Sequence, residues 1–85
     1  MNIAYTPEAV RQLSKLDKKI ARQITSYMDE VGKLQDPRSR GKALKGNLSD
    51  YWRYRSGDYR IVCKIQDLKL IVTVLWLGNR KEVYR

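Results

Sequence analysis

The chain has 85 residues, enough for one modest hydrophobic core but too few for two, so we expect a single domain over residues 1–85. Eighteen Lys and Arg against nine Asp and Glu give a formal net charge of +9, which favours a polyanionic partner such as nucleic acid or an acidic protein. One cysteine excludes an intrachain disulfide, and without histidine a zinc site has no plausible ligand set, so we expect no metal or cofactor.

Two features bear on location. The N-terminal stretch MNIAYTPEAVRQL lacks an apolar core of signal-peptide length. The longest uncharged apolar run, residues 70–77, is far too short to span a bilayer. With the single cysteine, these features predict a cytoplasmic protein that makes no membrane contact.

The first elements are a strand and a helix. Residues 2–5 are predicted to form a short strand, followed by Thr6 as helix N-cap and Pro7 at the first helical position, where its missing N–H costs nothing. The helix is expected to reach about Leu16. Its apolar face is predicted to carry Val10, Leu13 and Leu16.

A second, longer helix is predicted to begin after Asp17, which acts as its N-cap. Apolar residues repeat along it at helical spacing: Ile20, Ile24, Tyr27, Met28, Val31 and Leu34. Because the two helices are joined tightly at residues 16–17, they should form a hairpin.

Residues 35–50 are rich in Gly, Pro, Asn, Asp and Ser, which predicts a loop, and it carries Arg38, Arg40, Lys42 and Lys45. Connections of this length in compact domains are usually functional or disordered, and a basic one beside a basic sheet favours function. Leu44 and Leu48 are expected to pin the loop to the core.

From residue 51 the apolar periodicity changes to two, and three strands are predicted at about 51–56, 59–65 and 68–77. Hairpins at Gly57-Asp58 and Gln66-Asp67 join them. The fold class is therefore α+β: an N-terminal strand, a two-helix hairpin and an antiparallel three-stranded meander, with the helices packed on one face of the sheet.

The Gly57-Asp58 turn sets the register of the first hairpin and places Arg55 opposite Arg60. The predicted core face carries Trp52, Tyr54, Tyr59, Ile61, Cys63 and Ile65, and the outer face carries Tyr51, Arg53, Arg55, Arg60, Val62 and Lys64. A two- or four-residue second loop would add Leu70, Val72, Val74 and Trp76 to the core face, whereas a three-residue loop would invert that strand.

Like charges directly across an antiparallel pair are destabilising, by roughly 0.2–1 kcal/mol. Cations on a sheet can serve only to block aggregation, which is one explanation of the outer face. The clustering of guanidinium groups, which suit bidentate contact with phosphate, favours an anion-binding site instead. The last strand neighbours the Arg60 strand, so its exit should bring Arg80 and Tyr84 toward the same anion.

The segments LKG, YWRYRSGDYRIV and LGNRKEVY together resemble the RelE branch of the RelE/ParE toxin superfamily. The likeness covers nearly the whole chain, from the Tyr5-Thr6-Pro7 helix entry to Tyr84. It implies a microbial-RNase-like fold, binding to the A site of the 30S ribosomal subunit, cleavage of the mRNA positioned there, and inhibition by an antitoxin encoded alongside.

The resemblance also implies roles for individual residues. Arg60 matches the sheet arginine that contacts the scissile phosphate, Arg80 matches the arginine of the Gly-x-Arg ending, and Tyr84 matches the tyrosine that stacks on or hydrogen-bonds the substrate. Arg53 and Arg55 occupy the place of two basic residues on the preceding strand. Further contacts to RNA or the ribosome are expected from Lys42, Lys45, Lys64, Lys81 and Arg85.

RNA cleavage without metal requires the 2′-hydroxyl to attack the adjacent phosphate, with one proton removed and another delivered. Arginines can stabilise the added negative charge but, with pKa values above ~12, are poor bases. Tyr84 could act as base or acid if nearby guanidinium groups favour its ionised form, or it could only stack. Many relatives have histidine where this chain has Asn79, so that candidate acid is missing.

The expected function is a toxin of a type II toxin–antitoxin system: a metal-independent mRNA interferase that depends on the ribosome to align its substrate. A RelB-like antitoxin should present an acidic segment that folds over the basic sheet or displaces Tyr84, and the complex is expected to bind operator DNA through the antitoxin. The alternatives are a ParE-like gyrase inhibitor without nuclease activity and a non-catalytic RNA-binding module.

Overall fold

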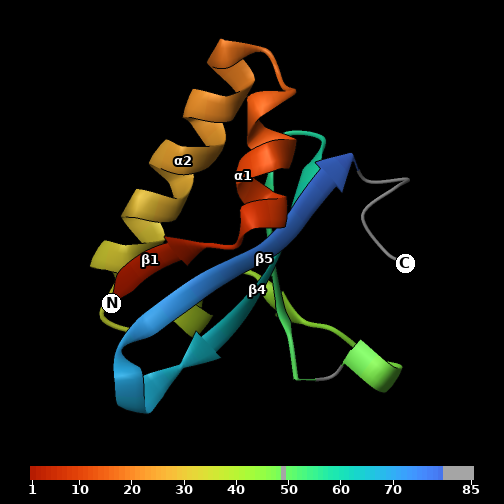
Figure 1. Cartoon of the computed structure of the whole chain (residues 1–85). Helices are drawn as coiled ribbons and strands as arrows, with labels where there is room; N and C mark the ends of the chain where they lie inside the picture. The colour runs from red at the N-terminus through yellow and green to blue at the C-terminus, as the bar shows by residue number, and fades with distance from the viewer. Residues whose placement is uncertain (49, 80–85) are drawn as a thin grey trace.

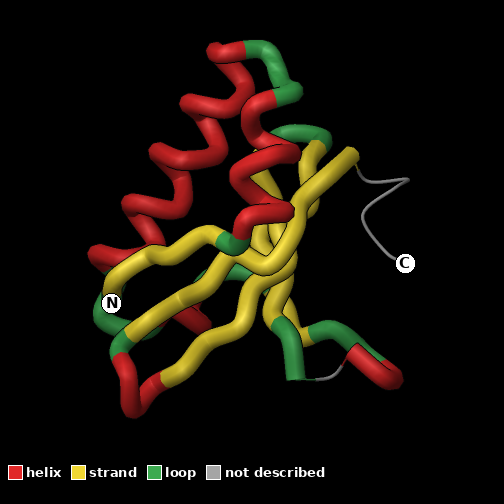
Figure 2. The backbone as a smooth tube through the Cα atoms, in the orientation of Figure 1, coloured by secondary structure: helices red, strands yellow, loops and turns green. Residues whose placement is uncertain are grey.

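A computed structural model of the chain describes residues 1–48 and 50–79 (Figure 1). Its described residues form a five-stranded mixed sheet in the order β1-β5-β4-β3-β2. Two helices lie together on one side of this sheet, as the tube in Figure 2 also shows. The α+β class and the placement of both helices on one sheet face are therefore confirmed.

The N-terminal strand β1 (Asn2–Tyr5) leads directly into α1 (Pro7–Ser14). As predicted, Thr6 is the N-cap, and its hydroxyl accepts a hydrogen bond from the Ala9 backbone N–H at 3.1 Å. The predicted apolar face was wrong at Val10, which is 54 % exposed. The helix buries the preceding residue, Ala9, completely, and successive positions are rotated by about 100°.

The second helix, α2 (Lys18–Lys33), begins as predicted, because the Asp17 carboxylate accepts a hydrogen bond from the Lys19 backbone N–H at 2.8 Å. The helix buries Ile24, Met28 and Val31. Together the helices and the sheet enclose one core cluster of buried residues, namely Ala9, Ile24, Met28, Val31, Tyr54, Ile61, Cys63, Val72, Val74 and Leu77.

The first predicted hairpin is confirmed pair by pair between β3 (Trp52–Ser56) and β4 (Tyr59–Gln66), including Arg55 opposite Arg60. Gly57 adopts a φ of +58°, in the left-handed region that glycine accommodates without steric cost. The predicted core face of these two strands is confirmed as well, since Tyr54, Ile61 and Cys63 are fully buried.

The second hairpin contains an irregularity that the sequence pattern did not predict. Four residues, 67–70, connect β4 to β5 (Ile71–Asn79), and the predicted inward positions of Val72 and Val74 are confirmed. The prediction of a core position for Leu70 was wrong, because this residue belongs to the connecting turn and is 61 % exposed. A register shift follows: Cys63 pairs with Val74, but Val62 pairs with Trp76. Because the bulge adds one residue to β5, the prediction for Trp76 was wrong, and Leu77 enters the core instead.

Side chains and backbone at α1 hold this bulge. The Thr6 backbone N–H donates to the Val74 carbonyl at 3.0 Å, and the Thr6 hydroxyl donates to the Leu75 carbonyl at 2.5 Å. On the far side of the bulge, the Leu77 backbone N–H donates to the Gln12 side-chain oxygen at 2.7 Å. Backbone N–H and carbonyl groups that the irregular strand pairing would otherwise leave without a hydrogen bond are therefore bonded to Thr6 and Gln12.

Two further strands extend the predicted meander. β1 runs parallel to β5, and the two-residue strand β2 (Lys42–Ala43) pairs antiparallel with β3. Residues 35–50, predicted as a loop, therefore include a strand, with short 3₁₀ turns at Pro37–Ser39 and Gly46–Leu48. A third such turn, Asp67–Lys69, lies between β4 and β5.

Polar contacts fasten the segment 35–41 to the sheet. The Tyr54 hydroxyl donates to the Pro37 carbonyl at 2.6 Å, and the Trp52 indole N–H donates to the Arg40 carbonyl at 2.7 Å. Arg38 forms a two-point ion pair with Asp67 at 2.8 and 3.0 Å, which holds the pKa of that carboxyl below its usual range. Leu44 and Leu48 are the residues predicted to anchor this segment to the core. Leu44 is half-buried but does not belong to the core cluster, and the side chain of Leu48 is outside the described part of the chain.

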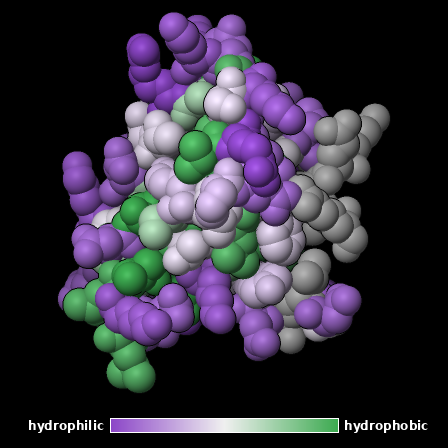
Figure 3. Space-filling model, viewed as in Figure 1, coloured by the Kyte–Doolittle hydropathy of each residue, from purple (hydrophilic) through white to green (hydrophobic). Residues whose placement is uncertain are grey.

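The surface seen in Figure 3 is mostly hydrophilic, with a hydrophobic corner at the β4–β5 turn. Leu68 and Leu70 are exposed in that turn, and Leu70 adopts a left-handed φ of 55°. Within residues 1–48 and 50–79, no helix has the length and apolar character needed to cross a membrane.

We predict that Tyr54→Phe lowers the free energy of unfolding by about 1–3 kcal/mol, because the substitution leaves the Pro37 carbonyl without its hydroxyl donor. Urea denaturation followed by circular dichroism measures the change. Tyr27→Phe is the matched control. The Tyr27 and Tyr54 rings pack together with their centroids 6.1 Å apart, but the Tyr27 hydroxyl makes no hydrogen bond to the described residues. Equal stability of the two variants would contradict the assigned role of this contact.

Candidate nucleic-acid interface

The sheet face opposite the helices carries a cluster of basic and aromatic side chains. The register places these residues in rows across neighbouring strands, because partners in an antiparallel pair lie on the same face. We define this surface, the arginine face, by Lys42, Tyr51, Arg53, Arg55, Arg60, Val62, Lys64 and Trp76. The sequence predicted all of these positions except those of Trp76 and of Lys42, which was expected in a loop and lies in the unpredicted strand β2.

The arginine face has one row in which cations face each other directly. Arg55 pairs with Arg60 across β3 and β4, and Gly78 pairs with Arg60 from β5. Arg55 is exposed, whereas Arg60 is half-buried, so their repulsion is only partly screened by water. Because glycine contributes no side chain at position 78, the arginine pair is bordered by bare backbone on the β5 side.

The adjacent row crosses four strands. Lys42 pairs with Arg53, Arg53 with Val62, and Val62 with Trp76. Val62 is fully buried although it points away from the core cluster. An aromatic pair lies on the same face, where the Tyr51 and Trp76 rings meet edge to face with centroids 5.7 Å apart and an interplanar angle of 85°.

The end of β5 leads to this surface. Its last residues, Gly78 and Asn79, pair with Arg60 and Tyr59, so the predicted exit of the strand beside Arg60 is confirmed. The remaining C-terminal candidates, Arg80, Lys81, Tyr84 and Arg85, lie outside the described residues. Lys45 is exposed two residues after β2, but no strand pairing places it on the arginine face.

Several groups with strongly perturbed proton affinity lie on the core side of the sheet. Burial raises the pKa of the Cys63 thiol and of the Tyr54 hydroxyl, and burial together with the nearby Asp29 raises the pKa of Tyr5 to about 12. None of the residues that define the arginine face is a carboxylate, a cysteine or a histidine. The described part of this face can therefore hold an anion but offers no near-neutral proton carrier.

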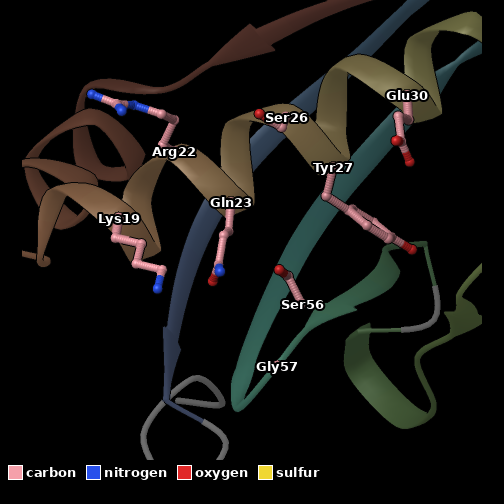
Figure 4. A pocket seen from close by; sticks show the side chains of 8 residues that line it. All are labelled: Lys19, Arg22, Gln23, Ser26, Tyr27, Glu30, Ser56 and Gly57. Atoms are coloured by element: carbon pink, nitrogen blue, oxygen red, sulfur yellow. The ribbon is translucent and has the colours of Figure 1, made fainter.

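A separate groove lies on the helix side of the sheet, between α2 and the tip of the β3–β4 hairpin, with a volume of about 910 Å³. It is lined by Lys19, Arg22, Gln23, Ser26, Tyr27, Glu30, Ser56 and Gly57. In Figure 4 the side chains of Gln23 and Tyr27 extend from α2 toward the hairpin. Its lining combines the cations Lys19 and Arg22 with the carboxylate of Glu30, so it lacks the purely cationic character of the arginine face.

A smaller pocket of about 250 Å³ borders the arginine face and is lined by Tyr27, Gly41, Lys42, Arg53 and Arg55. Gly41 adopts a φ of +79°, and a Cβ at this position would collide with the Arg53 carbonyl. This position therefore requires glycine, which lets the chain turn tightly into β2 beside the cationic row.

Comparison with known proteins identifies the family. The profile of the family described as ParE toxin of type II toxin-antitoxin system, parDE, matches residues 3–84. A curated relative, Toxin RelE from Mycobacterium tuberculosis, is 33 % identical over 85 residues, covering 99 % of this chain and 86 % of the relative. The chain belongs to the RelE/ParE toxin superfamily.

Other relatives point to the RelE side of this superfamily. The mRNA interferase toxin RelE of Escherichia coli is 31 % identical over 83 residues, covering 94 % of this chain and 85 % of the relative. The chain is also similar to a solved structure of the toxin–antitoxin complex RelBE2 from Mycobacterium tuberculosis, with a TM-score of 0.83 and 26 % identity over 93 % of this chain and 96 % of the matched chain. The protein is therefore a RelE-like toxin of the type II toxin–antitoxin class.

We predict that Arg55→Gln raises the free energy of unfolding at low salt by about 0.2–1 kcal/mol, because it removes the repulsion across the Arg55–Arg60 pair. The gain should shrink at high salt, where charges are screened. Urea denaturation at two salt concentrations measures it, with Arg22→Gln as control for the loss of an exposed arginine on α2. A destabilised Arg55→Gln variant would show that the pair is not repulsive in the free protein.

Proposed function

We propose that this RelE-like toxin is a ribosome-dependent mRNA endonuclease, which cleaves A-site codons by attack of the 2′-hydroxyl on the adjacent phosphate. The observation that carries the proposal is the pairing of Arg55 with Arg60 beside Arg53 on one solvent-facing surface. Three guanidinium groups on adjacent strands can contact one phosphodiester from several directions. The name of the Escherichia coli relative, an mRNA interferase toxin, supports the same activity.

In this mechanism, Arg60 and Arg55 bind the scissile phosphate and stabilise the additional negative charge that develops as the 2′-oxygen attacks. Arg53, in the next row, binds the neighbouring phosphate. Preorganised cations at such positions typically contribute several kcal/mol of transition-state stabilisation. Arg80 completes the cluster and Tyr84 moves a proton or stacks on a base; both roles are part of the proposal.

The ribosome has a specific task in this scheme. The arginine face supplies charge but no near-neutral base, so the reaction depends on holding the 2′-oxygen, the phosphorus and the leaving oxygen in line. A ribosome that fixes the mRNA in its A site would provide that alignment. Free RNA should accordingly be cut slowly, and the toxin should act in the cytoplasm, where ribosomes are.

An antitoxin is the proposed inhibitory partner, as the RelBE2 complex suggests by its name. With a net charge of +9, the toxin suits an acidic segment that covers the arginine face or displaces Tyr84. Binding of the complex to operator DNA would then occur through the antitoxin. The curated relatives at 31–33 % identity are named RelE, which favours mRNA cleavage over inhibition of gyrase.

We predict that Arg60→Ala reduces mRNA cleavage in a translating extract by at least about 100-fold, the effect expected when one transition-state charge contact is lost. Primer extension maps the cuts within ribosome-bound codons. Arg22→Ala, which removes an exposed arginine from α2, should cleave like the wild type. Unchanged cleavage by a folded Arg60→Ala variant would refute the phosphate-binding role, and relaxed DNA accumulating instead of cut mRNA would support gyrase inhibition.

Tyr84→Phe separates the two roles proposed for the terminal tyrosine. If the hydroxyl transfers a proton, the single-turnover cleavage rate should fall by roughly 10²–10⁴-fold, whereas the ring that stacks is retained. The rate on programmed ribosomes, measured over a range of pH, is the readout. A wild-type rate in this variant would remove the hydroxyl from the mechanism and leave stacking as the function of Tyr84.

A further inference from the structure

We propose that Tyr51 and Trp76 form a stacking subsite for one base of single-stranded RNA, next to the arginines that bind its phosphates. This inference rests on the proposed function. It adds to the phosphate-binding arginines a pair of residues that bind a base. The two rings meet nearly at right angles, with an interplanar angle of 85° and centroids 5.7 Å apart. Such a corner can place one ring against the face of a base and the other against its edge.

The position of Trp76 follows from the bulge in β5. In a regular ladder this indole would point into the core, as the alternation of Val72 and Val74 shows. The extra residue at the bulge places Trp76 on the face of Val62 and Arg53 instead. Three hydrogen bonds hold the strand in this arrangement: Thr6 donates two, to the Val74 and Leu75 carbonyls, and the Gln12 side-chain oxygen accepts one from the Leu77 N–H.

The surroundings of the aromatic pair match the chemistry of single-stranded nucleic acid. Trp76 lies in one row with Lys42 and Arg53, and the next row contains Arg55 and Arg60. Strand geometry puts the Cα atoms of positions 60 and 76 about 8 Å apart, a separation comparable with one nucleotide step. Aromatic rings flanked by a line of cations bind bases by stacking and phosphates by charge.

A purely structural role for the pair would be to cover Val62, which is fully buried on this face. That role requires apolar area and no aromatic ring, so an aliphatic side chain at position 76 would fulfil it. Stacking on a base requires the π-face. Trp76→Leu and Trp76→Phe therefore separate the two roles, because both cover Val62 but only the second retains a ring.

The binding test uses intrinsic fluorescence. The chain has two tryptophans, and Trp52→Phe leaves Trp76 as the only indole. Because Trp52 also donates a hydrogen bond to the Arg40 carbonyl, this background is used after circular dichroism shows that it is folded and its affinity for the oligomer matches that of the wild type. In this background we expect a short 2′-O-methyl oligoribonucleotide, which cannot be cleaved, to quench the emission. The matched probe is the same oligomer with abasic residues, which keeps the phosphates and should quench far less. Equal quenching by both oligomers, or none by either, would overturn the proposal.

The affinity test uses the same 2′-O-methyl oligomer with the wild type and the two Trp76 variants. Trp76→Leu should weaken binding by about 5- to 150-fold, the range for loss of one base–aromatic stack, and Trp76→Phe should stay within about threefold of the wild type. Wild-type affinity for Trp76→Leu, shown by circular dichroism to be folded, would overturn the subsite.

Cleavage in the translating extract separates this inference from the proposed function. If the wild type cuts no mRNA but quenching still requires bases, the nuclease proposal fails and the stacking subsite stands. If the wild type cuts mRNA but base-bearing and abasic oligomers quench alike, the subsite fails and the nuclease proposal stands.

Discussion

Because side chains alternate across a β-strand, one extra residue in β5 reverses the face on which every later side chain of that strand lies. Before the bulge, Val72 and Val74 fill the core; after it, Leu77 takes over that role and Trp76 turns to the arginine face. As a result, β5 places Val72, Val74 and Leu77 in the core and presents Trp76 and Gly78 on the arginine face. The helix layer fixes this reversal through Thr6 and Gln12.

Repulsion between the cations of the arginine face lowers the stability of the fold, and burial of the core easily offsets this loss. A like-charge pair such as Arg55–Arg60 opposes folding by roughly 0.2–1 kcal/mol. Full burial of one aliphatic side chain, such as Ile61 directly behind the pair, contributes about 1.5–3 kcal/mol. Repulsion on this scale is tolerable in the free protein, and an anion placed between the guanidinium groups would convert it into attraction.

The sequence predicted those parts of the fold that local signals determine. The Gly57-Asp58 turn sets its own register, so the pairing of Arg55 with Arg60 and the core positions of Tyr54 and Ile61 followed from counting residues. The N-caps followed in the same way from Thr6 and Asp17, whose side chains accept hydrogen bonds from nearby backbone N–H groups.

Features that depend on contacts between distant segments could not be derived in this way. At the bulge, the Leu77 N–H is hydrogen-bonded to Gln12, which lies 65 residues away in the chain, and β2 pairs with an edge of β3 that only the folded sheet provides. The exposure of Val10 follows from the close approach of Ala9 to the sheet, which a periodic pattern does not reveal. The site was consequently predicted for Arg53, Arg55 and Arg60 but not for Trp76.

The attachment of β3 has a consequence for the entropy of binding. The inward side chains of this strand, Trp52 and Tyr54, are bonded to the carbonyls of Arg40 and Pro37, while the alternate residues, Arg53 and Arg55, face outward. Arg53 and Arg55 therefore project from a strand whose opposite face is held by these two hydrogen bonds. The spacing of their Cα atoms is set before an anion binds. Little conformational freedom of the main chain is left to lose on association, so the conformational entropy lost by the protein falls mainly on the arginine side chains.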